Sequence, residues 1–347
     1  MATTPSHATF LLNSTCALRR IGAGHCGSVW ANPEDDAGSV VKREDGGPGR
    51  SLSNDYTIHR RLLESLRGFD VSSIESQINI PSNPTFVRQD DPFWDQVLAN
   101  LPVGYTACNG LISERIPSMP RSSRNLLIEK YCTASLSEKI SKDKNNDDCI
   151  IRPYLGRRRH NREGASTSRF AAFTLRNYPL NADQMEELGL DMPRYARAMG
   201  DALAFMHWKV GIDANDVEFV LAPKRSTMQG TNCTLGGALF PEGCLDEHAL
   251  WILDFDCCRL ITMDDEGIDR CVAAYYRNDP FYPRPGKQDV TDVKTWEAFR
   301  EQYLSRSGAL LLGREEKVTG LPARFIQQLV LRVDDFKSGR HNGQVGR

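Results

Sequence analysis

The chain has 347 residues, of which 40% are hydrophobic and 25% charged, and this composition is typical of a globular protein with a substantial core. Its formal net charge of −2 predicts no general attraction to DNA or to a membrane surface. No apolar run approaches the roughly 18 residues of a membrane-spanning helix, and the first residues lack the pattern of a secretory signal. We therefore expect a cytoplasmic protein with no membrane partner, whose ten cysteines are free thiols.

The cysteines do not have the spacing of a common zinc site. Ten, three and eight residues separate the successive members of the group Cys233, Cys244, His248 and Cys257, and Cys258 follows directly. Zinc fingers usually contain closely spaced cysteine pairs of the C-x2-C type, and this group has none. We therefore predict no metal site and expect the thiols to pack as small apolar side chains.

A glycine-rich turn lies near the start of the chain, after an expected flexible arm at residues 1–17. Gly22, Gly24 and Gly27 separate two strand-like segments. Glycines in such a turn allow backbone N–H groups to approach a phosphate closely, so the turn is a candidate for phosphate binding.

A strand lysine and a helix acid follow this turn. Residues 39–42 predict a short strand that ends on Lys42, and the periodicity of residues 52–66 predicts a helix with Asp55 in its first turn. The small lobe of protein kinases has a glycine-rich loop, a strand lysine and a helix acid in this order, so the region resembles that lobe. A surface lysine and an acid that only favours the start of a helix are the alternatives at these positions.

This resemblance predicts an α+β protein with a two-lobed, protein-kinase-like fold. A small β-rich lobe is expected at residues 18–117, a larger and mainly helical lobe at 118–336, and a disordered tail at 337–347. Residues 68–104 are rich in Pro, Asn, Ser and Asp and are expected to form a long connection, whereas residues 193–209 have the clearest helical periodicity.

Five carboxylates interrupt two apolar segments that otherwise have the pattern of buried strands. Carboxylates in such strands are costly unless a metal, a proton or a cationic partner compensates them. We therefore predict that both segments contribute to one acidic site. Its members are Asp213, Asp216 and Glu218 in the first segment, and Asp254 and Asp256 in the second.

These acids occupy positions that matter in kinases, but their identities differ from the kinase pattern. Asp213 corresponds to the catalytic Asp, Glu218 to the metal-binding Asn, and Asp254 to the Asp of D-F-G. Gly211-Ile212 replaces the His-Arg of the catalytic loop, and Asp256 replaces the Gly of D-F-G. Such a group of acids can hold Mg²⁺, or it can supply general acid and base groups without phosphoryl transfer.

Two further segments are candidates for binding. Residues 150–162 form the dense basic block of the chain, which can contact an RNA backbone or form a solvated loop. Residues 273–285 are rich in aromatic side chains and proline, and they can line a pocket for an amino acid or form a rigid surface loop. The candidates are Arg157, Arg158, Arg159 and Arg162 in the first, and Tyr275, Asn278 and Asp279 in the second.

Five motifs together resemble a fungal family described as an uncharacterised "zinc finger protein" domain, over roughly residues 15–335. Some members of that family resemble, or are, arginine-containing cyclodipeptide synthases, which join aminoacyl groups from two charged tRNAs into a cyclic dipeptide of secondary metabolism. The motifs are ISERIP (112–117), IRPYLGRRR (151–159), DANDVEFVLAP (213–223), WILDFDCCR (251–259) and NDPFYPRP (278–285).

The resemblance implies a tRNA-dependent cyclodipeptide synthase that forms a cyclo(Arg-Xaa) diketopiperazine. Its partners are arginyl-tRNA and a second charged tRNA, and it requires no cofactor because an aminoacyl ester is already activated. One carboxylate takes the proton of the attacking amine, and another pairs with the arginyl guanidinium. The implied catalytic residues are Asp213, Asp216 and Glu218; Asp254, Asp256, Lys42, Tyr275, Asn278 and Asp279 bind substrate, and Arg157, Arg158, Arg159 and Arg162 contact tRNA.

Two alternatives come from the kinase-like order of the motifs. The first is a small-molecule phosphotransferase that uses ATP and Mg²⁺ through Lys42, Asp213, Glu218 and Asp254. The second is a catalytically inactive binding module. The missing His-Arg and the altered D-F-G weaken the phosphotransferase, and the density of retained acids weakens the inactive module.

Overall fold

The computed structural model describes residues 16–36, 38–159, 173–225, 233–241 and 243–337, and the chain divides into two compact units. Unit 1 consists of Met1–Arg152, Asn161–Pro179 and Val217–Cys257, and unit 2 consists of Pro153–His160, Leu180–Asp216 and Cys258–Arg347. The lobe boundaries at residues 17, 117 and 336 stay predictions. Residues 1–15 of the expected arm and 338–347 of the expected tail lie outside the described residues.

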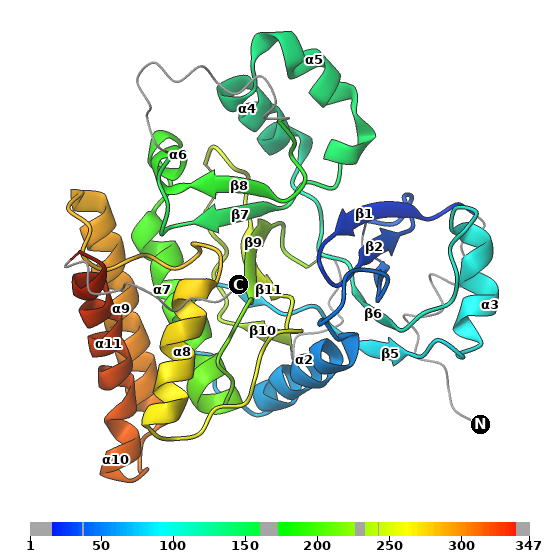
Figure 1. The fold of residues 1–347 in the computed structure, drawn as a ribbon. Coiled ribbons are helices and arrows are strands. Elements are labelled where there is room, and N and C mark those ends of the chain that lie inside the picture. The colour runs from blue at the N-terminus through cyan, green and yellow to red at the C-terminus, as the bar shows by residue number, and fades with distance from the viewer. Residues whose placement is uncertain (1–15, 37, 160–172, 226–232, 242, 338–347) are drawn as a thin grey trace. The chain divides into compact units, whose positions relative to one another are not determined.

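The protein is a mixed α+β structure (Figure 1). Unit 1 contains the strands β1 (Arg19–Ala23), β2 (Ser28–Ala31), β3 (Ser39–Arg43), β4 (Ile78–Asn79), β5 (Thr85–Val87), β6 (Gly110–Glu114), β9 (Glu218–Ala222), β10 (Thr234–Leu235) and β11 (Ala249–Leu253). Its helices are α2 (Leu52–Leu66), α3 (Phe93–Val97), α4 (Arg121–Tyr131) and α5 (Ala134–Lys142). The strands β7 (Ile151–Tyr154) and β8 (Tyr178–Asn181) begin in unit 1 and end in unit 2.

Unit 2 is mainly helical. Its elements are α6 (Ala182–Glu187), α7 (Met192–Ala204), the π-helix η3 (Phe205–Val210), α8 (Asp265–Arg277), α9 (Val290–Leu310), α10 (Glu316–Thr319) and α11 (Leu321–Lys337).

The first sheet of unit 1 has five strands in the order β1-β2-β3-β6-β5, and each strand is antiparallel to its neighbours. Its central strand β3 alternates buried and partly exposed residues, which is the pattern of a strand with one face on a core. Val41 of β3 is paired with Trp30 and Ile112 and belongs to the same buried cluster. Helix α2 packs against β5 and β6 with its apolar side.

The second sheet has six strands in the order β10-β4-β11-β9-β7-β8. Phe219–Ala222 of β9 and Ala249–Ile252 of β11 are buried at every position, so these two central strands are covered on both faces. They are antiparallel, and Glu218 at the start of β9 is paired with Leu253 at the end of β11. Short, continuous apolar runs therefore form the middle of this sheet, and polar residues begin where the strands end.

The core of unit 2 lies between α7, α8, α9 and α11, which lie side by side in Figure 1. Helix α7 approaches α9 closely at Gly200, where a Cβ would lie 3.0 Å from the carbonyl oxygen of Phe299. Aromatic side chains fill the centre, with the rings of Tyr275 and Tyr282 stacked at 5.0 Å and Tyr303 against Phe325 at 5.1 Å. Burial of these large rings supplies the hydrophobic stabilisation of the unit.

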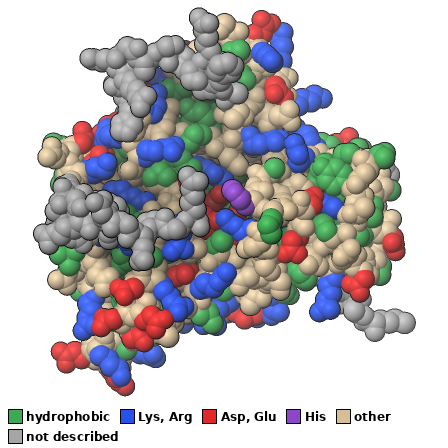
Figure 2. Space-filling model, in the orientation of Figure 1, with side chains coloured by type: hydrophobic (Ala, Val, Ile, Leu, Met, Phe, Trp, Pro, Cys, Tyr) green, Lys and Arg blue, Asp and Glu red, His purple; other side chains and the backbone are tan. Residues whose placement is uncertain are grey.

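The structure corrects two expectations about secondary structure. Residues 68–104 are not a plain connection, because they contain β4, β5 and α3, which are too short to give a periodic signal in sequence. The helix expected at 193–209 ends as an α-helix at Ala204 and continues as the π-helix η3. Among the described helices, none is both long and apolar enough to cross a membrane. Figure 2 shows basic and acidic side chains interspersed over the visible face.

Candidate functional site

None of the five predicted acids lies in the interior of a strand, since Glu218 begins β9 and the other four lie in loops. Glu218 is the first residue of β9, and Asp254 directly follows the last residue of β11. Because β9 and β11 are antiparallel, both residues lie at the same end of this pair of strands. Asp213 and Asp216 lie in the turns of unit 2 that precede β9 in the chain, and Asp256 follows β11. The prediction of acids within buried strands was therefore wrong, because the apolar residues alone form the buried part of each strand.

In unit 1, the side chain of Lys42 lies between two carboxylates. Its Nζ is 2.8 Å from Oδ2 of Asp55 on α2 and 2.8 Å from Oδ1 of Asp254. Burial is the strongest single influence and lowers the pKa of Lys42, but the two carboxylates together outweigh it and raise the pKa well above its usual value. Lys42 therefore stays protonated. The acid of the helix and the lysine of the strand, which the sequence only placed in order, form an ion pair.

Helix α2 also holds the segment after β11. Oδ1 of Asp55, the oxygen that does not contact Lys42, accepts a hydrogen bond from the backbone N–H of Phe255 at 3.3 Å. Arg50 donates to Oδ1 of Asp256 at 2.8 Å, and the amide of Asn54 donates to the carbonyl oxygen of Asp256 at 2.8 Å. Burial and the neighbouring charge of Asp254 raise the pKa of Asp256. Arg50 and Asn54 were missed from the sequence, although they flank Asp55 at the start of the predicted helix.

The glycine-rich turn beside this cluster has a fixed shape. Gly27 has φ of 152°, and a Cβ at this position would lie 1.9 Å from the carbonyl oxygen of Arg43. The turn is closed by a hydrogen bond from the N–H of Gly24 to the carbonyl oxygen of Gly27 at 2.9 Å. Burial raises the pKa of Cys26 in this turn to about 12, so the thiol is protonated and unreactive at neutral pH.

Glu218 has a cationic partner within unit 1. Nη2 of Arg152 on β7 lies 2.6 Å and 2.5 Å from the two carboxylate oxygens of Glu218. Both side chains are about one fifth exposed, at 19% and 21%. The pair neutralises the charge of Glu218, and its catalytic role stays a prediction. No local pattern in the sequence pointed to this partner, because the two residues lie 66 positions apart.

Asp213 in unit 2 is stabilised differently. Its Oδ1 accepts hydrogen bonds from the backbone N–H groups of Asn215 at 3.1 Å and Arg259 at 2.9 Å. Among the described residues it forms no side-chain ion pair, and its Oδ2 has no hydrogen-bond partner. Burial raises the pKa of Asp213, and the two backbone hydrogen bonds oppose that shift only in part. A carboxylate with a raised pKa is suited to accept a proton.

The turn that carries Asp213 and Asp216 is bound to Asn278 at the end of α8. Nδ2 of Asn278 donates to the carbonyl oxygen of Ala214 at 2.9 Å, and its Oδ1 accepts from the N–H of Asp216 at 2.6 Å. Ala214 and Asp216 have positive φ values of 53° and 64°, and Asp254 in unit 1 has one of 66°. Non-glycine residues rarely adopt this conformation, and it is concentrated at functional sites.

The other predicted ligand-binding residues of unit 2 have defined contacts. Tyr275 is buried, stacks on Tyr282, and donates its hydroxyl hydrogen to the carbonyl oxygen of Pro283. Asp279 is exposed and accepts a hydrogen bond from the hydroxyl of Tyr154 at 2.7 Å. The structure therefore accounts for Tyr275 as a core residue, and substrate binding by either residue stays a prediction.

The described part of the basic block is paired with acids and polar groups of unit 2. Arg158 forms ion pairs with Glu186, Asp289 and Asp292, and Arg159 with Asp183 and Glu187. Arg157 donates to Oδ1 of Asn181 at 2.7 Å, and its guanidinium lies over the ring of Tyr154. These pairs reduce the positive charge that the block offers to a polyanion. The tRNA contact stays a prediction, and Arg162 lies outside the described residues.

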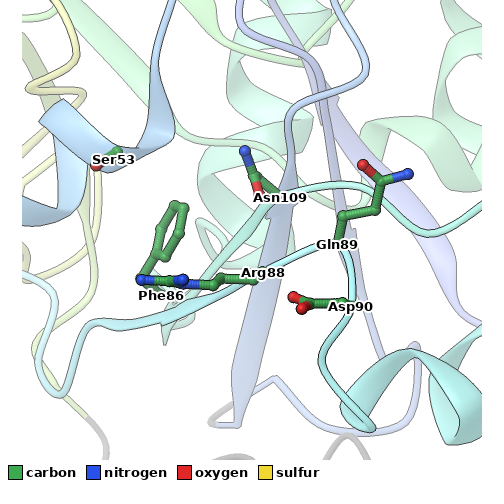
Figure 3. Close-up of a pocket in the computed structure, with 6 residues that line it drawn as sticks. All are labelled: Ser53, Phe86, Arg88, Gln89, Asp90 and Asn109. Atoms are coloured by element: carbon green, nitrogen blue, oxygen red, sulfur yellow. The ribbon is translucent and has the colours of Figure 1, made fainter.

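A separate hollow of about 750 Å³ lies in unit 1 (Figure 3). Figure 3 shows residues of α2, of β5 and the turn that follows it, and of the segment before β6 around it. Its lining is mostly polar, and none of the predicted site residues belongs to it. The lining residues are Ser53, Phe86, Arg88, Gln89, Asp90 and Asn109.

One comparison finds a similarity for part of the chain. A family model described as "Zinc finger protein" matches residues 250–315, so this part is similar to that family. The matched range includes Asp254, Asp256 and Asn278. A comparison with curated proteins gives no match.

The cysteines and His248 do not form a zinc site among the described residues of either unit. All ten cysteines are described, and none of them forms a disulfide. Nδ1 of His248 lies 2.7 Å from the carbonyl oxygen of Asp246 within its own loop, and its ring stacks on Phe240. Burial raises the pKa of Cys233, which favours the thiol over the thiolate that binds metal. Taking the described residues of each unit separately, no three His, Cys, Asp or Glu ligand atoms cluster within 4.8 Å.

Proposed function

We propose that the protein is an aminoacyl-tRNA-dependent cyclodipeptide synthase that condenses an arginyl group with a second aminoacyl group. The observation that carries the proposal is Asp213, a buried carboxylate with a raised pKa whose Oδ1 is held by two backbone N–H groups. The five sequence motifs support the same assignment, and the family match at residues 250–315 covers two of them.

The chemistry requires a proton acceptor and no cofactor. The α-amine of one aminoacyl ester attacks the carbonyl carbon of the other, the ester C–O bond breaks, and the tRNA hydroxyl leaves. A second attack by the remaining free amine on the remaining ester closes the ring and releases the second tRNA. In each step the nitrogen loses a proton and the leaving oxygen gains one. In the proposal Asp213 carries this proton, since a base with a raised pKa can both accept and return it.

The acids of unit 1 are the proposed site for the arginyl guanidinium. Asp254 uses Oδ1 for Lys42, and its Oδ2 has no hydrogen-bond partner among the described side chains and backbone groups. Carboxylates bind guanidinium groups with paired, charge-assisted hydrogen bonds. In the contact of Glu218 with Arg152, a single guanidinium nitrogen, Nη2, reaches both carboxylate oxygens. Asp216 and Glu218 complete the proposed catalytic motif, and Arg157, Arg158 and Arg159 are the proposed tRNA contacts.

The test is expression in a host without the pathway, followed by mass spectrometry of the medium. We expect a cyclic arginyl dipeptide whose formation in extract is abolished by RNase. Asp213→Asn should lower the yield about 100-fold or more, since the base is removed. Asp269→Asn changes an exposed carboxylate of α8 in the same unit and should leave the yield unchanged. If the wild-type protein makes no such product, or Asp213→Asn makes it at the normal rate, the proposal is wrong.

The second candidate is an ATP- and Mg²⁺-dependent phosphotransferase on a kinase-like scaffold. One specific observation favours it: Lys42 of β3 pairs with the acid of α2 and with Asp254 after β11. The strand order β1-β2-β3-β6-β5 and the glycine-rich turn support the proposal that unit 1 contains a kinase-like small lobe. In this candidate Asp254 and Glu218 hold Mg²⁺ and Asp213 is the base.

Calorimetric titration with ATP and Mg²⁺ separates the two candidates. A phosphotransferase should bind ATP, and Lys42→Met should weaken that binding about tenfold or more because the phosphate loses its cation. Lys130→Met, which removes an exposed lysine of α4 in the same unit, should not. Failure of the wild-type protein to bind ATP excludes the phosphotransferase and leaves the cyclodipeptide synthase unaffected.

A further inference from the structure

The turn at residues 211–216 is held in an unfavourable backbone conformation. Gly211, Ala214 and Asp216 all have positive φ, and only the first is a glycine. An L-residue with a Cβ avoids this region because its Cβ crowds the following carbonyl oxygen. Two such residues within three positions require contacts from outside the turn that compensate for the strain.

The compensating contacts come from Asn278. Its side-chain amide donates to Ala214 and accepts from Asp216, so it binds the two residues with positive φ at the same time. Asn278 is only 6% exposed, and its own N–H donates to the carbonyl oxygen of Ala274 at 2.9 Å, which fixes its backbone to the end of α8. A neutral amide is the side chain that can donate and accept in this way, whereas a carboxylate can only accept.

The clamped turn sets the position of Asp213. Oδ1 of Asp213 accepts from the N–H of Asn215, the residue between the two that Asn278 binds. It also accepts from the N–H of Arg259, while the N–H of Asp213 donates to the carbonyl oxygen of Arg259 at 2.9 Å. If the turn relaxes, the Asn215 hydrogen bond is lost and the carboxylate can rotate toward water.

We infer that Asn278 is a positioning residue that holds the Asp213 carboxylate in its working orientation by clamping the strained turn between them. The inference rests on the proposed role of Asp213 as a base, and it differs from the substrate-binding role that the sequence predicted for Asn278. Both the amide nitrogen and the amide oxygen of Asn278 contact the turn.

Four other titratable groups interact with Asp213 within unit 2. Arg259 and Arg277 lower its pKa through their charges. His207 of η3 lies against the backbone of Asp213, and burial lowers the pKa of this histidine to about 3, so it is neutral above that pH. Burial and the charge of Asp213 raise the pKa of Cys271 on α8.

The test uses Asn278→Leu and Asn278→Ala, two uncharged variants that both remove the two hydrogen bonds to the turn. Protein labelled with ¹³C at the aspartate carboxyl carbon gives a titration curve for Asp213 by NMR, with Asp213→Asn identifying its signal. Burial dominates the raised pKa, so a turn opened to water should move the Asp213 midpoint downward, by about half a pH unit or more in Asn278→Leu. Ser307→Ala removes a buried hydroxyl of α9 in the same unit and should leave the midpoint unchanged.

The kinetics of the synthase reaction provide a second measurement of the role of Asn278. In the synthase reaction Asn278→Leu should lower kcat about tenfold or more, change KM by less than about threefold, and move the acidic limb of the pH profile to lower pH. Asn278→Ala removes the same hydrogen bonds with a smaller, uncharged side chain and should show the same shifts. An Asp213 midpoint that is unchanged in a folded leucine or alanine variant overturns the inference. Absence of product from the wild-type protein overturns only the proposed function, because the NMR titration does not depend on activity.

Discussion

The acids of unit 1 and Asp213 of unit 2 are stabilised by different means. Asp55 and Asp254 share Lys42, Asp256 pairs with Arg50, and Glu218 with Arg152, so each is compensated by a cationic side chain. Asp213 instead relies on backbone N–H groups within a strained turn. Burial raises the pKa of Asp213, and it also raises the pKa of Asp256 although Arg50 lies beside that carboxylate. The comparison therefore separates acids whose charge is paired with a cationic side chain from one that only backbone donors hold.

The largest expected effect comes from removing the shared cation of unit 1. Lys42→Met leaves the buried Asp55 and the partly buried Asp254 without compensation, and we expect a loss of about 3 kcal/mol in the free energy of unfolding. Urea denaturation followed by circular dichroism measures this loss. Lys42→Arg should retain most of the stability, and Lys130→Met all of it. Wild-type stability in Lys42→Met would mean that the carboxylates do not need the lysine.

A somewhat smaller effect is expected in the glycine-rich turn, which tests whether unit 1 also depends on backbone geometry. Gly27→Ala places a Cβ 1.9 Å from a carbonyl oxygen at a φ of 152°, so we expect a loss of about 2–3 kcal/mol. Gly24→Ala is the matched control, because a Cβ there has no atom within 4 Å. Equal denaturation midpoints for the two variants would contradict this account of the turn.

The sequence predicted the parts of the fold whose signal is local. Strand, turn, strand and helix at residues 18–66 follow from periodicity and glycine placement, and the structure has them within a few residues. Lys42 and Asp55 lie 13 residues apart, and the order of the predicted strand and helix was enough to consider them together. Lys42 and Asp254 are 212 residues apart, and Arg152 and Glu218 are 66 residues apart. Both contacts therefore depend on which strands are neighbours in the sheets. A periodic pattern says which face is buried and does not say which distant strand is adjacent.

The ion pair between Arg152 and Glu218 is expected to make a smaller contribution to the free energy of unfolding. The pair is partly buried, so its coupling should exceed that of a surface ion pair and fall short of a fully buried one. We expect a coupling energy of about 1–2 kcal/mol from a double-mutant cycle of Arg152→Met and Glu218→Gln. Arg60→Met with Glu64→Gln on α2 is an exposed control pair and should give about 0.5 kcal/mol or less. Equal couplings in both cycles would show that Glu218 is effectively solvated and remains available to substrate.

The smallest expected effect is the dependence of stability on the ionisation of Asp213. Its folded pKa is raised above the unfolded value, so between these two pKa values the folded protein binds more protons and loses stability as pH rises. Asp213→Asn keeps an oxygen that can accept both backbone hydrogen bonds and cannot ionise. Its unfolding free energy relative to wild type should therefore improve from pH 4 to pH 7, whereas that of Asp269→Asn should stay constant. A constant difference for Asp213→Asn would mean that the carboxylate ionises normally in the folded protein, and the contrast with the ion-paired acids of unit 1 would then disappear.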